Sequence, residues 1–245
     1  MGQKEYMNIW KEESMDNYLV VTTKPWNIRE FDLLSLFVKS SIGEEHNFSL
    51  ITHTSHLSFD LVKAINPKKI FFPHWSWKIP KEIYENWECI VFHMTDLPFG
   101  RGGSPLQNLI KRGIKDTKIS AIKVVEELDA GPIYIKEDLS LEGSALNIFG
   151  KFAFIVFRIM IPKLIKEDII PVPQEGEIVI FDRLKPEDGC INDLDDINKV
   201  YDYIRMLDAK GYPKAFLETD AFKIRFSDPS MNEDGVLHAT VDIFP

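Results

Sequence analysis

Cys89-Ile90-Val91-Phe92-His93 is an apolar run that ends in a histidine, and the segments before it indicate the kind of sheet it joins. Three other short apolar runs precede it and alternate with segments of helical periodicity, at residues 18–23, 48–52 and 69–72. This alternation predicts right-handed crossovers and a mostly parallel sheet with helices on both faces. Ligands bind such sheets at the carboxyl ends of the strands, which is where His93 lies.

Apolar spacing and terminal residues predict the helices. One helix is expected over residues 28–39 with Asn27 as its N-cap, and a second over residues 59–65, closed by Asn66-Pro67. Pro105 suits a first helical turn, which predicts a helix over residues 106–111. Two more strands are expected around Asp129, over residues 118–125 and 132–139, and residues 149–163 are most simply a core-facing helix.

The sequence changes character near Pro171-Val172-Pro173. Short strands are expected after it over residues 177–181 and 222–226, with a helix over residues 198–208 between them. The predicted architecture is therefore α/β. It has a mostly parallel, Rossmann-like core over residues 1–171 and a small C-terminal α+β subdomain over residues 172–245.

Composition points to a globular protein of a reducing compartment. The 245 residues are 44% hydrophobic and 27% charged, with a formal net charge of −9. Two cysteines, Cys89 and Cys190, form no disulfide framework, so the cytoplasm is expected. Residues 1–15 lack the apolar region of a signal peptide, and Arg158 and Lys163 interrupt the most apolar stretch, so no membrane span is expected.

Two phrases carry residues suited to chemistry. The first runs Val91-Phe92-His93-Met94-Thr95-Asp96-Leu97-Pro98-Phe99-Gly100-Arg101-Gly102-Gly103-Ser104-Pro105, and the second Glu127-Leu128-Asp129-Ala130-Gly131-Pro132-Ile133. An imidazole can move a proton near neutral pH, and a carboxylate within reach fixes its tautomer. Taken alone, His93 could equally be a structural residue at a strand end, and Asp129 a turn residue.

Together the two phrases resemble the catalytic core of the formyltransferases that use 10-formyltetrahydrofolate, over roughly residues 60–190. The resemblance implies a Rossmann-like fold, N10-formyltetrahydrofolate as the formyl donor, and His93 and Asp129 as catalytic residues. The family has an asparagine two residues before the histidine, where this chain has Val91. His74 is the first candidate to supply the missing donor to the oxyanion, followed by Thr95, Ser104 and backbone N–H groups.

The resemblance also implies two sets of binding residues. The donor is expected to contact Phe72, His74, Trp75, Arg101, Gly102, Val125, Glu126, Glu127, Leu128 and Asp129. The acceptor is expected to contact Thr95, Ser104, Arg183, Lys185, Tyr212 and Phe216. Arg101 could instead form a structural salt bridge, and the aromatic residues suit core packing equally well. No metal site is expected.

The acceptor is predicted from charge and from the C-terminal part. Acidic residues outnumber basic ones after Pro173, and a net charge of −9 disfavours a substrate held through many phosphates. The prediction is N-formylation of a nucleotide-linked deoxyamino sugar, such as a UDP- or dTDP-linked 4-amino-4,6-dideoxyhexose of surface polysaccharide, by a monomer or homodimer without nucleic-acid or membrane partners. The alternatives are a methionyl-tRNA formyltransferase, a formyltetrahydrofolate hydrolase, and a non-catalytic module that binds folate or a nucleotide.

Overall fold

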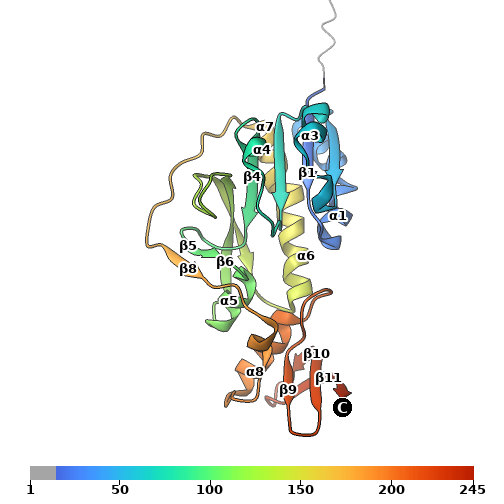
Figure 1. The fold of residues 1–245 in the computed structure, drawn as a ribbon, viewed down its shortest axis with the longest axis vertical. Helices are drawn as coiled ribbons and strands as arrows, with labels where there is room; N and C mark the ends of the chain where they lie inside the picture. The colour runs from blue at the N-terminus through green and yellow to red at the C-terminus, as the bar shows by residue number, and fades with distance from the viewer. Residues whose placement is uncertain (1–14) are drawn as a thin grey trace, which may run out of the picture.

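A computed structural model describes residues 15–245, so the N-terminal segment expected to lack a signal peptide lies outside the described residues apart from Met15. At its centre is a six-stranded sheet in the order β2-β1-β3-β4-β6-β7 (Figure 1). The strands are β1 (Asn17–Val21), β2 (Asn47–Ile51), β3 (Lys69–Pro73), β4 (Glu88–His93), β6 (Asp116–Lys123) and β7 (Ile133–Ser140). The strands β1 to β4 are parallel to one another, and β6 pairs in an antiparallel manner with both β4 and β7. The predicted mostly parallel core is therefore confirmed.

Successive residues of the strands pack against helices on opposite faces of the sheet, as the two-residue period of a strand requires. Tyr18, Phe71 and Phe92 belong to the larger hydrophobic core, whereas Leu19 and Ile70 belong to a second core on the other face. The helices of this part of the chain are α1 (Pro25–Phe31), α2 (Leu34–Ile42), α3 (Phe59–Ile65), α4 (Lys81–Tyr84) and α5 (Pro105–Lys111), and a 3-10 turn, η1, lies at Thr54–His56.

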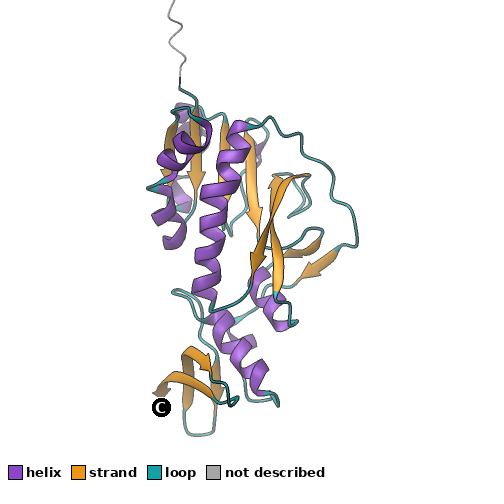
Figure 2. Ribbon diagram, turned by 180° about the vertical axis from the view of Figure 1, so that it is seen from behind, coloured by secondary structure: helices purple, strands orange, loops and turns teal. Residues whose placement is uncertain are grey.

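A long helical run covers the larger core and contains the predicted helix over residues 149–163. It comprises α6 (Ala145–Ile155), a π-helical turn η2 (Val156–Met160) and α7 (Ile161–Lys166), and Figure 2 shows it as one continuous helix beside the sheet. Ser144 begins it with a capping box, in which its hydroxyl accepts the N–H of Asn147 and the Asn147 amide oxygen accepts the N–H of Ser144.

The helix predicted over residues 28–39 is wrong in its start and its continuity. The chain forms α1 and α2 with a break between them, and α1 begins at Pro25, whose fixed φ suits the first helical turn. Asn27 is therefore a buried residue within α1, not an N-cap. Its side-chain amide donates to the hydroxyl of Thr22 at 2.9 Å and to the carbonyl of Pro73 at 3.1 Å, which joins the ends of β1 and β3.

Some elements have too weak a pattern to be predicted: α4, β5 (Phe99–Gly102), β9 (Phe216–Glu218) and β11 (Leu237–Phe244). The strand expected over residues 177–181 forms as β8 (Val179–Phe181) and pairs in parallel with β5. A segment over residues 167–178 leads to it from α7 along the side of the molecule (Figure 1). The range 172–245 thus begins with residues that pair with the core.

The remaining C-terminal residues form the predicted α+β appendage. It contains a 3-10 turn η3 (Pro186–Gly189), helix α8 (Ile197–Leu207) and an antiparallel sheet of β9, β10 (Lys223–Met231) and β11. Arg205 of α8 fastens it to the core, because its guanidinium donates to the carbonyls of Leu141 at 2.6 Å and Gly143 at 3.0 Å. Gln107 of α5 adds a hydrogen bond to the carbonyl of Met206.

Both cysteines are free thiols; Cys89 is buried in β4, and burial raises its pKa to about 12. Within residues 15–245, no helix combines the length and the apolar character needed to cross a bilayer.

The burial pattern of the long helical run gives a test with matched side chains. Phe157 is fully buried, whereas Phe154 on the same run is 46% exposed. Phe157→Ala should lower the free energy of unfolding by about 3–5 kcal/mol, since it removes a buried ring and leaves a cavity. Phe154→Ala should cost less than about 1.5 kcal/mol, and equal urea midpoints for the two variants would contradict this packing.

Candidate active site

His93 is the last residue of β4 and is only 7% exposed. Its Nε2 lies 2.8 Å from the carbonyl oxygen of Gly100, so Nε2 carries a hydrogen and donates it there. Nδ1 lies 3.6 Å from the Oδ1 atom of Asp129, which is within ion-pair distance and too long for a hydrogen bond. In the neutral ring, Nδ1 therefore bears the lone pair that faces the carboxylate.

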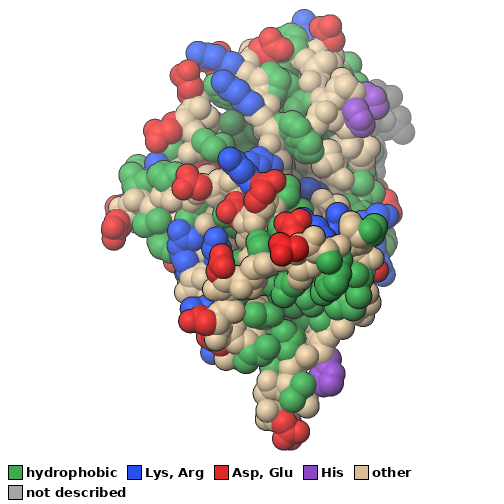
Figure 3. Space-filling view, turned by 60° about the horizontal axis from the view of Figure 1, so that its bottom comes forward, with side chains coloured by type: hydrophobic (Ala, Val, Ile, Leu, Met, Phe, Trp, Pro, Cys, Tyr) green, Lys and Arg blue, Asp and Glu red, His purple; other side chains and the backbone are tan. Residues whose placement is uncertain are grey.

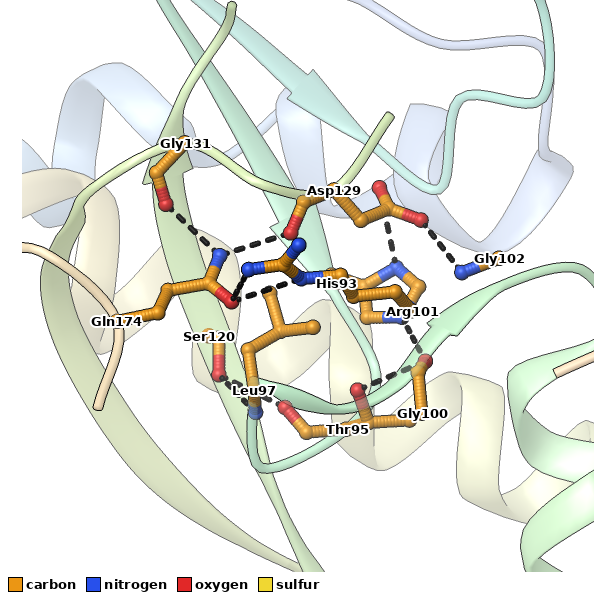
Figure 4. A network of polar contacts seen from close by, with 10 residues as sticks. All are labelled: His93, Thr95, Leu97, Gly100, Arg101, Gly102, Ser120, Asp129, Gly131 and Gln174. Atoms are coloured by element: carbon orange, nitrogen blue, oxygen red, sulfur yellow. Dashed lines mark hydrogen bonds and ion pairs between the residues drawn. The ribbon is translucent and has the colours of Figure 1, made fainter. Parts of the chain in front are cut away.

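Asp129 lies in the loop between β6 and β7 and reaches back to His93 (Figure 4). Its backbone is left-handed, with φ of 53°, and its Oδ2 atom accepts the backbone N–H of Gly102 at 2.9 Å. A glycine is needed two residues later, because a Cβ on Gly131 would lie 1.7 Å from the carbonyl oxygen of Lys123. The structure thus brings His93 and Asp129, the two residues predicted to be catalytic, close to one another.

The loop after β4 is tied down by hydroxyl groups. Thr95 is fully buried and donates to the carbonyl of Gly100 at 3.2 Å, and Ser120 donates to the carbonyl of Thr95 at 2.7 Å. The carbonyl of Gly100 therefore accepts hydrogen bonds from both Thr95 and His93. Because Thr95 is fully buried and its hydroxyl proton is donated to Gly100, its position supports the loop that holds the His93 ring and does not suit the predicted contact with an acceptor.

The side-chain contacts of His74 within residues 15–245 are with residues outside the His93 network. Its φ is 53°, its Nε2 lies 3.2 Å from the hydroxyl of Tyr212, and its ring packs edge-on against Phe149 at 4.6 Å between centroids. The residue keeps some exposed surface, but its Nδ1 is shielded from solvent, and burial, then the charge of Lys24, lower its pKa to about 3. His74 is therefore a neutral residue packed on α6, which does not fit the proposed contact with an oxyanion beside His93.

Lys24 joins the group around His74. Its ammonium lies 5.5 Å from the ring centroid of Tyr212 and 5.8 Å from that of Trp26. Burial, then the positive charge of Arg183, lower the pKa of Lys24, while burial raises that of Tyr212 to about 12. No acidic side chain within residues 15–245 forms an ion pair with Lys24 or Arg183. Lys24 could not be identified from the sequence, because Tyr212 and Arg183 come from distant segments.

The other residues assigned to the acceptor lie in two places. Ser104 accepts the backbone N–H of Leu184 at 3.1 Å, and a Cβ on Gly103 would lie 2.6 Å from Arg183, so this segment crosses the start of α5. Arg183 and Lys185 are exposed there. Phe216 is buried in the C-terminal subdomain under the ammonium of Lys223, which does not fit an acceptor contact.

The residues assigned to the donor surround the Asp129 loop. The strand ladder of β6 ends at Lys123, which leaves the backbone of Val125, Glu126 and Leu128 outside it, and the Leu128 side chain is 72% exposed. Phe72 is fully buried, so only its backbone could touch a ligand, and Trp75 packs on its ring with centroids 6.0 Å apart. A flat polar heterocycle would find backbone donors and acceptors along this loop.

Arg101 of β5 forms an ion pair with Glu127 and hydrogen bonds with Gln174. Its guanidinium donates to Glu127 at 3.2 Å and twice to the side-chain oxygen of Gln174, at 2.9 and 3.1 Å. Gln174 was missed by the sequence reasoning, since a glutamine in an irregular segment carries no pattern. Within residues 15–245, no cluster of three or more histidine, cysteine or acidic side chains could hold a metal ion.

Comparisons with known proteins agree on one family. A family model described as "Methionyl-tRNA formyltransferase, C-terminal domain" matches residues 186–244. A protein named methionyl-tRNA formyltransferase from Thermodesulfovibrio yellowstonii is 31% identical over 170 residues, which are 66% of this chain and 55% of that protein. The chain thus spans about half the length of the curated relatives it matches.

Solved structures match over more of the chain. The structure named "Methionyl-tRNA formyltransferase from Clostridium thermocellum" has a TM-score of 0.87 and 50% identity, and the match covers 94% of this chain and 99% of that one. A sugar N-formyltransferase from Shewanella has a TM-score of 0.65 at 15% identity, covering 92% and 96%. At that identity, the second likeness concerns the fold alone.

The buried neutral His74 has a consequence for acid stability. Its pKa is about 3 when folded and 6.5 in the unfolded chain, so between these values only the unfolded chain binds the proton. Proton uptake by His74 in the unfolded chain leaves the free energy of unfolding nearly unchanged above pH 6.5. Below pH 6.5 it lowers the free energy of unfolding progressively, by up to about 1.36 kcal/mol per pH unit. Between pH 7.5 and 5.5, His74→Gln should lose about 1 kcal/mol less unfolding free energy than the wild type in urea titrations. The exposed His56→Gln is the control, and equal losses for wild type and His74→Gln would contradict the assignment.

Proposed function

This chain belongs to the formyltransferase family that uses 10-formyltetrahydrofolate, and we propose that it transfers the formyl group of this donor to the amino group of methionyl-tRNA. The observation that carries the proposal is the 50% identity, over 94% of this chain, to a structure named methionyl-tRNA formyltransferase. The reducing cytoplasm, where both thiols would stay free, suits this reaction.

The acceptor predicted from the sequence, a nucleotide-linked amino sugar, is wrong. Curated relatives at 31% identity and a solved structure at 50% are named for methionyl-tRNA, whereas the sugar N-formyltransferases resemble this chain at 15% and 16% identity. The expectation of no nucleic-acid partner is corrected with it.

Net charge is a poor guide to the acceptor, because it is a property of the whole chain and tRNA binding depends on local charge. The net charge of −9 sums the whole chain, but on the face in Figure 3 basic and acidic side chains are interspersed. A tRNA needs cations only where it touches the protein. Lys24, Arg183 and Lys185 are candidates for such contacts, since Lys24 and Arg183 have no acidic partner among residues 15–245.

In the proposed reaction, the acceptor amine attacks the formyl carbon of the donor, and a C–N bond forms while the carbonyl oxygen becomes an oxyanion. With Nε2 of His93 donating to Gly100, Nδ1 is the atom that can accept the amine proton. The Asp129 carboxylate, 3.6 Å away, would then stabilise the imidazolium. When the oxyanion re-forms the carbonyl and the bond from the formyl carbon to N10 of the folate breaks, the proton can pass from Nδ1 to N10.

The donor would lie along the loop that carries Asp129. Backbone groups of Val125, Glu126 and Leu128 would bind the pterin edge, and Leu128 would cover its face. Gly102 and Arg101 border the same space through their contacts with Asp129 and Glu127. A glycine is required at position 102, because its φ of 107° disfavours a residue with a Cβ and a Cβ there would lie 2.4 Å from the carbonyl oxygen of Phe181.

The proposed proton transfer predicts a large effect of substituting His93. His93→Asn should lower kcat at least about 10²-fold and leave folate binding close to that of the wild type, since general acid–base groups contribute roughly 10²–10⁴-fold. Turnover is measured by folate absorbance and binding by calorimetry, with the exposed His56→Asn as control. A folded His93→Asn protein with wild-type kcat would remove His93 from the mechanism.

The acceptor is tested directly with methionyl-tRNA and 10-formyltetrahydrofolate, by following formylmethionyl-tRNA and folate together. We expect acceptor-dependent turnover, with a KM for the tRNA that rises steeply with salt because phosphate contacts release counterions. Arg183→Ala should reduce the log–log salt slope by about 0.7–0.9, the share of one phosphate, whereas Lys63→Ala on α3 should leave it unchanged.

Two results would contradict the proposed function, and a third would contradict only the role of Arg183. Formate release without an amine would indicate a hydrolase, and folate binding without turnover would indicate a binding module. An unchanged salt slope in Arg183→Ala would remove Arg183 from the acceptor site.

A further inference from the structure

Gln174 lies in the segment over residues 167–178 and uses every hydrogen-bonding position of its side-chain amide (Figure 4). Its oxygen accepts from Nε and Nη2 of Arg101, at 3.1 and 2.9 Å. Its nitrogen donates to the backbone carbonyls of Asp129 and Gly131, both at 2.8 Å. Two accepted and two donated bonds are the full capacity of a glutamine amide.

These contacts act on a turn that contains a strained residue. Asp129 holds a left-handed backbone, which costs on the order of 1 kcal/mol or more for a residue with a Cβ and persists where surrounding contacts enforce it. The carbonyls that Gln174 binds are those of Asp129 itself and of the glycine two residues later. The amide therefore fixes the turn from which the Asp129 carboxylate projects.

Strand β5 holds the same turn from the other side. Gly102 donates its N–H to the carboxylate of Asp129, and the neighbouring Arg101 donates to Gln174, which binds the carbonyl of Asp129. The carboxylate of Asp129 is thus bound directly to Gly102. The backbone carbonyl of Asp129 is bound through Gln174 to Arg101, the preceding residue of the same strand.

The segment that carries Gln174 is anchored on both sides of it. Val172 pairs with Ile133 through two backbone hydrogen bonds of 2.7 and 2.9 Å. Further on, Val179 donates to the carbonyl of Pro98 and begins β8, which pairs with β5. The backbone on both sides of Gln174 is therefore fixed by pairing with the core, which fixes the position of Gln174 relative to the turn.

We propose that Gln174 is a positioning residue that sets the Asp129 carboxylate against His93. It does so by binding the Asp129 turn to Arg101. This inference rests on the proposed catalytic roles of His93 and Asp129. It requires an amide, because a carboxylate at this position could accept from Arg101 but could not donate to the two carbonyls.

The test compares Gln174→Ala and Gln174→Glu with Asp129→Asn, and with Glu175→Gln as an exposed neighbouring control. Both Gln174 variants should lower kcat about 10- to 100-fold with little change in KM for either substrate, since misplacement by about 1 Å can cost 10²-fold. In an Asp129→Asn background, Gln174→Ala should cause little additional loss, because the two residues act through one group. Glu175→Gln should keep the wild-type kcat.

A second measurement needs neither substrate. Hydrogen exchange of the Gly102 amide reports directly on its bond to the side chain of Asp129, and exchange should be faster in Gln174→Ala and Gln174→Glu than in the wild type or Glu175→Gln. Protection of the Gly102 amide retained in both Gln174 variants would overturn the inference. Wild-type kcat in Gln174→Glu, or losses that add fully to those of Asp129→Asn, would overturn it as well.

The outcomes separate this inference from the function on which it rests. If Asp129→Asn turns over normally, the catalytic role of the pair fails and the inference fails with it. If Asp129→Asn is impaired and the Gln174 variants are not, the inference alone is wrong.

Discussion

The hydrogen bond from the Gly102 backbone to the Asp129 carboxylate is the interaction on which the candidate site depends. β6 pairs with β4 so that Lys123, its last residue, lies opposite Ile90, which is several residues before His93. The sheet alone therefore leaves the β6–β7 turn well short of His93. The turn folds back along β4, and the bond to Gly102 at 2.9 Å holds its carboxylate there.

The sequence predicted what depends on local patterns. Apolar runs located the strands of the core to within a residue or two at most ends, and Asn66 closes α3 at the predicted place with a left-handed φ of 48°. The proximity of His93 and Asp129 was expected from the resemblance of their two phrases to the formyltransferase core, not from local patterns. Short elements such as β5 and β9 were not, since pairing partners far along the chain define them.

Side-chain direction was the harder part of the site. His74 does follow a strand that neighbours β4, as predicted, but its left-handed backbone turns the ring onto the aromatic residues of α6. Nothing in the residues around His74 reveals that choice, which is decided by packing with Phe149 and Tyr212. Gln174 shows the same limit, since its three partner residues come from two separate segments, β5 and the β6–β7 turn.

The π-helical turn Val156–Met160 keeps the buried side chains of the long helical run on one face. Buried side chains recur there in adjacent pairs every four residues, at 148–149, 152–153, 156–157 and 160–161. An α-helix has 3.6 residues per turn, so each four-residue step rotates the apolar pair by about 40°, and three steps by roughly 120°. A turn with i→i+5 bonds accommodates more residues and counteracts that drift. One unbroken helix can thus stay against the curved sheet for its full length, and a four-residue apolar repeat in a sequence is a readable sign of such a widened turn.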